Sequence, residues 1–94
     1  MNLRQVNTPM PKVKIYTTSS CSYCVSAKSF LGRLGVPYQE INLDGNEGLR
    51  AELTVKNSGW RTVPMIFIGD EFIGGYRDMV GLHSENKLMP KLQP

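Results

Sequence analysis

The sequence predicts one α/β domain in which three helices flank a mixed four-stranded sheet, in the order β-α-β-α-β-β-α. Short apolar segments alternate with segments of helical periodicity over most of the 94 residues. A helical crossover joins the first two predicted strands, which makes them parallel. A two-residue turn joins the last two, which makes them antiparallel. The length is enough for one domain and too short for two.

The first predicted strand and the helix after it have the clearest patterns. Residues 13–17 alternate between apolar and polar side chains, as a half-buried strand does. Ser20 is the predicted N-cap of the helix, and Gly35 is its predicted end, with Pro37 just beyond. One face of this helix carries apolar residues at the i, i+3, i+4, i+7 spacing, namely Ala27, Phe30, Leu31 and Leu34.

The second strand is predicted over residues 38–43, with Ile41 and Leu43 on one of its faces. Asp44 and Glu47 follow it at the spacing of a capping box, with Asp in place of the usual Ser or Thr. This spacing predicts that a second helix begins directly after the strand.

The second helix is predicted from about residue 46 to residue 58, where it would bury Leu49 and Leu53. Gly59 is its predicted end, because glycine readily adopts the left-handed conformation that closes many helices. Residues 65–68, Met-Ile-Phe-Ile, form a continuous apolar run. Such a run indicates a strand that is buried on both faces.

A hairpin and a last helix complete the predicted order. Gly69–Asp70 predicts a two-residue turn, after which residues 71–73 return as the fourth strand. Gly74–Gly75 interrupts that strand, and the last helix is predicted to begin near Arg77. The buried side of this helix would use Met79, Leu82 and His83.

Composition and charge argue against several classes of protein. The chain is 40% hydrophobic and 20% charged, which is ordinary for a soluble domain. It has no apolar run near the roughly 20 residues that a membrane span needs. Its net charge of +3 comes from scattered Lys and Arg, and the absence of a basic block argues against nucleic-acid binding. A mild positive charge favours small anionic ligands.

Residues 1–11 are predicted to be a flexible N-terminal extension, and residues 12–94 the folded domain. The extension contains Pro9 and Pro11 and lacks the apolar core of a secretory signal. We therefore expect a cytoplasmic, reducing location. In such a compartment a lone, close pair of cysteines is more often catalytic than a structural staple.

Cys21 and Cys24 are the only cysteines, and they lie after a predicted strand at the start of a predicted helix. The first N–H groups of a helix have no partner within it, and the helix dipole is positive there. Both effects stabilise the thiolate of Cys21, which is the attacking species in thiol–disulfide exchange. Cys24 lies one turn further on, within reach of a mixed disulfide formed at Cys21.

Three other interpretations of the cysteine pair remain open from the residues alone. A structural disulfide would close so short a loop that it would constrain the unfolded chain little. A zinc site usually needs four ligands, and His83 is the only histidine in the chain. The third interpretation is that both cysteines are buried and inert, in which case their position at the start of the helix would have no function. Redox chemistry is the interpretation that we favour.

Three motifs follow one another along the chain: Ile15-Tyr16-Thr17 leading to Cys21-Ser22-Tyr23-Cys24, then Thr62-Val63-Pro64, then Gly74-Gly75-Tyr76-Arg77-Asp78. In this order and at these separations they resemble the glutaredoxin family, a branch of the thioredoxin fold. The resemblance implies a thioredoxin-like fold and a dithiol enzyme that reduces protein disulfides and protein–glutathione mixed disulfides with glutathione. It also implies that Cys21 attacks, and that Cys24 or a second glutathione resolves the intermediate. The match runs from Lys12 to Leu92.

The same resemblance implies a glutathione site. Val63–Pro64 would be a cis peptide that frees the Val63 backbone to pair with the cysteinyl part of glutathione; a plain strand-initiating proline is the alternative. The start of the last helix would hold the γ-glutamyl carboxylate, and Asp78 its ammonium. Without the resemblance, the position of Asp78 favours a different role, that of complementing the helix dipole. The implied glutathione-binding residues are Tyr23, Thr62, Val63, Pro64, Gly75, Tyr76 and Asp78.

Two positions depart from the family pattern. Ser22 replaces the proline that usually stands between the cysteines, which restores an N–H near the thiolate and removes a stiff ring. Thr18 stands where many glutaredoxins have a lysine that helps to hold a carboxylate of glutathione. Arg61, Arg50 and Lys56 are the candidates to replace that lysine.

Two alternative functions follow from these departures. Cys21 and glutathione from two chains would bridge a [2Fe–2S] cluster, making the chain a dimeric iron–sulfur carrier. Without a cluster we expect a monomer that holds no metal. A redoxin that depends on thioredoxin reductase is the other alternative, because Thr18 weakens the case for glutathione. The expected partners are glutathione and disulfide-containing or glutathionylated proteins, with no membrane and no nucleic acid.

Overall fold

The structure, a computed structural model, describes residues 12–93, so the extension predicted over residues 1–11 lies outside the described residues. The strands are β1 (Val13–Thr17), β2 (Gln39–Asn42), β3 (Met65–Ile68) and β4 (Glu71–Gly74). The helices are α1 (Ser22–Arg33), α2 (Glu47–Lys56), α3 (Tyr76–Ser84) and α4 (Leu88–Leu92). None of these helices has both the length and the apolar character needed to cross a membrane.

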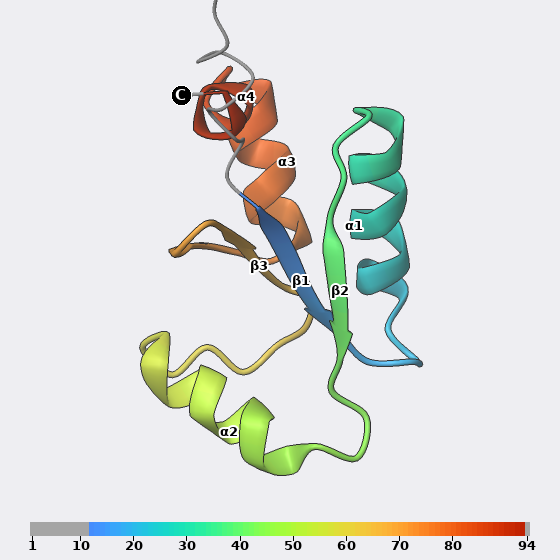
Figure 1. The fold of residues 1–94 in the computed structure, drawn as a ribbon, viewed down its shortest axis with the longest axis vertical. Helices are drawn as coiled ribbons and strands as arrows, with labels where there is room; N and C mark the ends of the chain where they lie inside the picture. The colour runs from blue at the N-terminus through green and yellow to red at the C-terminus, as the bar shows by residue number, and fades with distance from the viewer. Residues whose placement is uncertain (1–11, 94) are drawn as a thin grey trace, which may run out of the picture.

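The strands form one mixed sheet in the order β2-β1-β3-β4, and Figure 1 shows β1 between β2 and β3. β1 is parallel to β2, and β3 is antiparallel to β4, which confirms the two predicted pairings. β1 also pairs antiparallel with β3, which was not predicted. Tyr16, near the end of β1, pairs with Ile41 of β2 and with Met65 at the start of β3. The end of β1, which leads to the cysteines, therefore lies beside the start of β3.

Helices cover both faces of the sheet because side chains alternate along its strands. On one face, α1, α3 and α4 pack around a core that includes Ile15 and Ile66. On the other face, Leu53 of α2 packs with Met65. Figure 1 accordingly shows α3 and α4 close together and α2 set apart from the other helices. The two cores fix the sheet between the helices.

The three predicted helices are all present, and the described residues form a fourth, α4, which was not predicted. Its five residues are too few to show a helical period, and Pro90 within them resembles a helix breaker. Pro90 is the third residue of α4, where a backbone N–H would have no partner inside the helix. Leu88 and Leu92 are four positions apart and both buried, so one face of α4 closes the core beneath α3.

The prediction that Asp44 and Glu47 form a capping box at the start of the second helix is wrong. Asn46 caps α2, and its side-chain oxygen accepts a hydrogen bond from the Leu49 N–H at 3.1 Å. Gly45, with a φ of +74°, turns the chain between Asp44 and the helix. The Asp44 carboxylate instead accepts hydrogen bonds from the N–H and the hydroxyl of Ser19. Asp44 therefore holds the loop that precedes the cysteines.

Candidate active site

Cys21 is the N-cap of α1, which corrects the prediction that Ser20 has this role. The first helical residue is Ser22, so Cys21 is the last extended residue and its sulfur lies over the first turn. The sulfur accepts a hydrogen bond from the Cys24 N–H at 3.1 Å. The thiol donates to the Val63 carbonyl oxygen at 3.5 Å. The N–H donor and the positive end of the helix dipole both favour negative charge on this sulfur.

The two cysteines differ in exposure. Both are free thiols, but Cys21 is partly exposed whereas only 1% of Cys24 is exposed. Burial of Cys24, followed by its hydrogen bond with Cys21, raises the pKa of the Cys24 thiol to about 12. A substrate can therefore reach Cys21, while Cys24 stays protonated in the reduced protein near neutral pH.

Alkylation of the reduced protein is expected to follow the same order. Iodoacetamide near pH 7 should modify Cys21 and spare Cys24, and labelling of Cys24 should rise as the pH approaches about 12, because the thiolate is the nucleophile. Timed labelling followed by mass spectrometry of the peptides measures both rates. In guanidinium chloride the two thiols should react alike. Equal rates in the folded protein would contradict the assigned roles.

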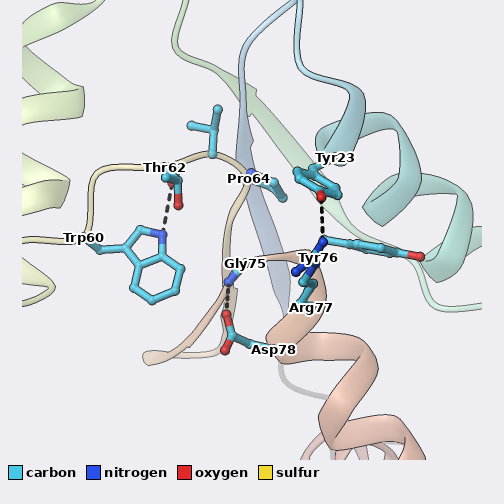
Figure 2. Close-up of a pocket in the computed structure, with 9 residues that line it drawn as sticks. Tyr23, Trp60, Thr62, Pro64, Gly75, Tyr76, Arg77 and Asp78 are labelled. Atoms are coloured by element: carbon cyan, nitrogen blue, oxygen red, sulfur yellow. Dashed lines mark hydrogen bonds between the residues drawn. The ribbon is translucent and has the colours of Figure 1, made fainter.

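A cavity of about 220 Å³ lies between the loop before β3 and the starts of α1 and α3 (Figure 2). Neither cysteine lines this cavity, but Val63 does, and its carbonyl oxygen contacts the Cys21 thiol. All seven residues that the resemblance implies for glutathione binding are thus brought together next to the exposed sulfur. The lining residues are Tyr23, Trp60, Thr62, Val63, Pro64, Gly75, Tyr76, Arg77 and Asp78.

The loop before β3 forms one wall of the cavity. The Val63–Pro64 peptide bond is cis, as the resemblance implies. The Trp60 indole N–H donates a hydrogen bond to the Thr62 carbonyl oxygen at 3.0 Å (Figure 2). The Trp60 ring also packs edge-on against Phe72, with 5.3 Å between the ring centroids. These two contacts fix the indole as part of the wall.

The start of α3 forms a second wall. The Asp78 carboxylate accepts a hydrogen bond from the Gly75 N–H through Oδ2 at 2.8 Å (Figure 2). Asp78, the third residue of α3, thus satisfies the N–H of the N-cap residue Gly75, as the third helical residue of a capping box does. Gly74 has a φ of +114°, and a Cβ atom there would lie 2.6 Å from Asp78 Oδ2. Only glycine suits position 74, whereas Gly75 has an ordinary φ of −100°.

Three side chains from α1 and α3 form the rim of the cavity. Tyr23 and Tyr76 stack with 6.0 Å between their ring centroids. The Arg77 guanidinium donates to the Tyr23 hydroxyl at 3.0 Å and lies 5.6 Å from the centroid of that ring. Tyr23 is 48% exposed. It is therefore a rim residue of the cavity and not part of the core.

Trp60 and Arg77 line the cavity although the sequence did not lead us to predict them as site residues. Each residue nevertheless carries a signal in the sequence. Trp60 is the single Trp of the chain and stands two residues before Thr62, and Arg77 lies inside the third motif. What the sequence could not supply is the direction in which each side chain points.

The three residues predicted to replace the missing lysine do not line this cavity. Arg50 donates a hydrogen bond to the Arg61 carbonyl oxygen at 2.9 Å. Lys56 pairs with Glu52 at 2.9 Å on the surface of α2. Arg77 is the one basic residue among the nine that line the cavity.

No three His, Cys, Asp or Glu side chains within residues 12–93 gather closely enough to hold a metal ion. His83, the remaining soft ligand, packs edge-on against Phe30 at 5.4 Å between centroids. The described part of the chain therefore offers no closed ligand set of the kind that zinc needs. A [2Fe–2S] cluster bridged between two chains would take one thiolate from each, that of Cys21, and stays a prediction.

Comparisons with known proteins point to one family. The glutaredoxin family model matches residues 13–73. A glutaredoxin of Pseudomonas aeruginosa is 51% identical over 79 residues, which cover 84% of this chain and 93% of that protein. Glutaredoxin 3 of Escherichia coli is 44% identical over 84 residues, which cover 89% of this chain and 100% of that protein.

Solved structures give the same result. The buckwheat glutaredoxin–glutathione complex superposes with a TM-score of 0.83 at 34% identity, covering 88% of this chain and 77% of that one. The solution structure of glutaredoxin from Brucella melitensis superposes with a TM-score of 0.78 at 42% identity, covering 88% and 89%. The shared architecture is the thioredoxin-like fold that the sequence predicts.

Proposed function

The chain belongs to the glutaredoxin family, and we propose that it is a glutathione-dependent thiol–disulfide oxidoreductase. Glutaredoxins are thiol oxidoreductases, so family membership supplies the class of reaction. The proposed substrates are protein–glutathione mixed disulfides and protein disulfides. One observation carries this proposal: the partly exposed Cys21 thiol contacts the Val63 carbonyl of a cavity that all seven implied glutathione-binding residues line.

Glutathione would lie along the loop before β3, with its sulfur next to Cys21. The Val63 backbone would pair with the cysteinyl part, and the first-turn N–H groups of α3 would take the γ-glutamyl carboxylate. Asp78 uses Oδ2 to cap its own helix, which leaves its other oxygen for the γ-glutamyl ammonium. The similarity to a glutaredoxin solved with glutathione supports this ligand.

Turnover of a protein–glutathione mixed disulfide takes two exchanges. The Cys21 thiolate attacks the glutathione sulfur, a new S–S bond forms to Cys21, and the protein thiolate leaves. The thiolate of a second glutathione then attacks the bound glutathione sulfur. Oxidised glutathione leaves and the Cys21 thiolate returns. The protein sulfur is reduced, and two glutathione sulfurs end as one disulfide.

A protein disulfide uses Cys24 as well. Once Cys21 is part of a mixed disulfide, it no longer provides the hydrogen bond and the charge that help to raise the pKa of Cys24. The Cys24 thiolate then attacks the Cys21 sulfur, forms the Cys21–Cys24 disulfide and releases the reduced protein. Two glutathione molecules reduce that disulfide and leave as oxidised glutathione.

The proposed partners are glutathione and proteins that contain disulfides or bound glutathione. We place the reaction in the cytoplasm, because it consumes reduced glutathione and that compartment keeps its thiol pool reduced. One chain holds the whole proposed site among its described residues, so the reaction requires a monomer only.

The choice of reductant tests this proposal. With a glutathionylated peptide as substrate, we expect turnover with glutathione, glutathione reductase and NADPH. Turnover with thioredoxin reductase and NADPH should be slower by at least about tenfold, a difference of about 1.4 kcal/mol in transition-state free energy. NADPH consumption measures both rates, with each reductase alone as the control. The reverse order would assign the chain to the redoxins that depend on thioredoxin reductase and overturn the proposal.

A further inference from the structure

Arg77 occupies a chemically distinct place in the cavity. It is the second residue of α3, its side chain is exposed, and it lines the cavity. Among the nine lining residues it supplies the single positive charge, and its neighbour Asp78 supplies the single negative charge. One cation and one carboxylate therefore stand together at the edge of an otherwise uncharged cavity.

The guanidinium of Arg77 is oriented by one hydrogen bond and keeps further N–H donors for a ligand. One nitrogen donates to the Tyr23 hydroxyl at 3.0 Å (Figure 2). The guanidinium carbon lies 5.6 Å from the centroid of the Tyr23 ring. A guanidinium has five N–H donors, so several remain for a ligand. Within residues 12–93 Arg77 forms no ion pair, since the ion pairs there all use lysines. Its charge is therefore available to an anion entering the cavity.

An α-amino acid head group matches this pair of charges. It carries a carboxylate and an ammonium on the same carbon, so it needs an anion-binding and a cation-binding group side by side. Arginine binds carboxylates with two parallel hydrogen bonds, which lysine cannot do. The γ-glutamyl end of glutathione is such a head group, with its α-carboxylate free.

We propose that Arg77 is a substrate-binding residue, whose guanidinium pairs with the α-carboxylate of a γ-glutamyl group while Asp78 receives the ammonium. This inference rests on the proposed function, because it assumes that glutathione is the ligand of the cavity. It would supply a cation for a carboxylate of glutathione from α3, whereas many family members have a lysine in the loop before α1, where this chain has Thr18. It also makes the α-carboxylate a determinant of specificity.

A double substitution cycle between protein and substrate tests the proposal. The protein change is Arg77→Gln, and the substrate change replaces the γ-glutamyl group of the mixed disulfide by 4-aminobutyryl, which lacks only the α-carboxylate. With the glutathione substrate, Arg77→Gln should raise KM by about tenfold or more with little change in kcat, as expected for the loss of a hydrogen bond between charged groups. With the analogue, the same substitution should change KM less than about twofold.

Three variants complete the design. Arg33→Gln removes the same charge from an arginine that lies over Phe30, outside the cavity, and should leave KM unchanged. Arg77→Lys should restore part of the affinity, because it keeps the charge and loses the paired geometry. Tyr23→Phe removes the hydroxyl that orients Arg77 and should cost less than Arg77→Gln. Circular dichroism and thermal unfolding check that each variant is folded.

The outcomes separate this inference from the proposed function. If wild-type protein does not turn over the glutathione substrate, the proposed function fails. If it does, and Arg77→Gln behaves like Arg33→Gln, only the role of Arg77 is overturned. An equal loss on both substrates, or a loss fully reproduced by Tyr23→Phe, would also overturn it, because Arg77 would then act through the shape of the rim.

Discussion

Replacing Cys21 by serine is expected to abolish reduction of glutathione mixed disulfides. The hydroxyl that replaces the thiol is far more weakly acidic and is not a nucleophile toward disulfide sulfur at neutral pH. Cys24 cannot take over, because it stays buried, and burial is the largest cause of its raised pKa. We expect a loss on the order of 10³-fold or more in kcat/KM, measured with a glutathionylated peptide, glutathione and glutathione reductase.

The Cys21→Ser protein should remain folded. Serine can still accept the hydrogen bond from the Cys24 N–H, which keeps a side-chain cap on α1. An unchanged far-UV spectrum and a small shift in thermal midpoint are the control. Turnover within about tenfold of wild type, in a variant that is folded, would show that Cys21 is not the nucleophile.

Replacing Cys24 by serine is expected to separate the two proposed reactions. Reduction of glutathione mixed disulfides should persist, because a second glutathione can resolve the Cys21 intermediate. Reduction of a protein disulfide should fall by about a hundredfold or more, because no thiol within the chain can release the mixed disulfide. The measurements are turnover on both substrates and mass spectrometry of the trapped adduct between Cys21 and the protein substrate.

Val25→Ser is a matched control for this variant. It places a hydroxyl on the next residue of α1, which is 58% exposed and does not line the cavity. We expect both reactions to proceed at the wild-type rate. If Cys24→Ser reduces protein disulfides as fast as wild type does, then Cys24 does not resolve the intermediate and the dithiol mechanism is wrong.

Much of the fold follows from local signals in the sequence. Gly35 lies just beyond the end of α1 with a φ of +71°, as the helix-end signal predicts. α2 instead ends at Lys56, and Ser58, with a φ of +59°, takes the left-handed conformation one residue before Gly59. The crossover and the hairpin correctly predict the parallel and antiparallel pairs of the sheet. α4 could not be predicted in this way, because five residues are too few to show a helical pattern. Packing against the core stabilises this helix.

Less of the site than of the fold can be predicted from the sequence, because the site depends on exact geometry. Whether Ser20 or Cys21 caps α1 depends on which residue is the last extended one, and a shift of one residue changes the capping side chain from a hydroxyl to the proposed nucleophile. The contact between Tyr23 and Arg77 joins residues 54 positions apart. It depends on how α1 and α3 pack, which no local motif specifies.

The antiparallel course of β3 has a practical consequence. Val63 and the cavity precede the first residue of β3, and the Gly69–Asp70 turn follows its last, roughly 13 Å away along the strand. The Gly69 N–H donates to the Lys12 carbonyl oxygen, so this turn is tied to the beginning of β1, at the end of the sheet that is remote from the reactive sulfur. Inserted peptides, fluorophores or immobilisation tags placed in this turn would leave the redox chemistry undisturbed.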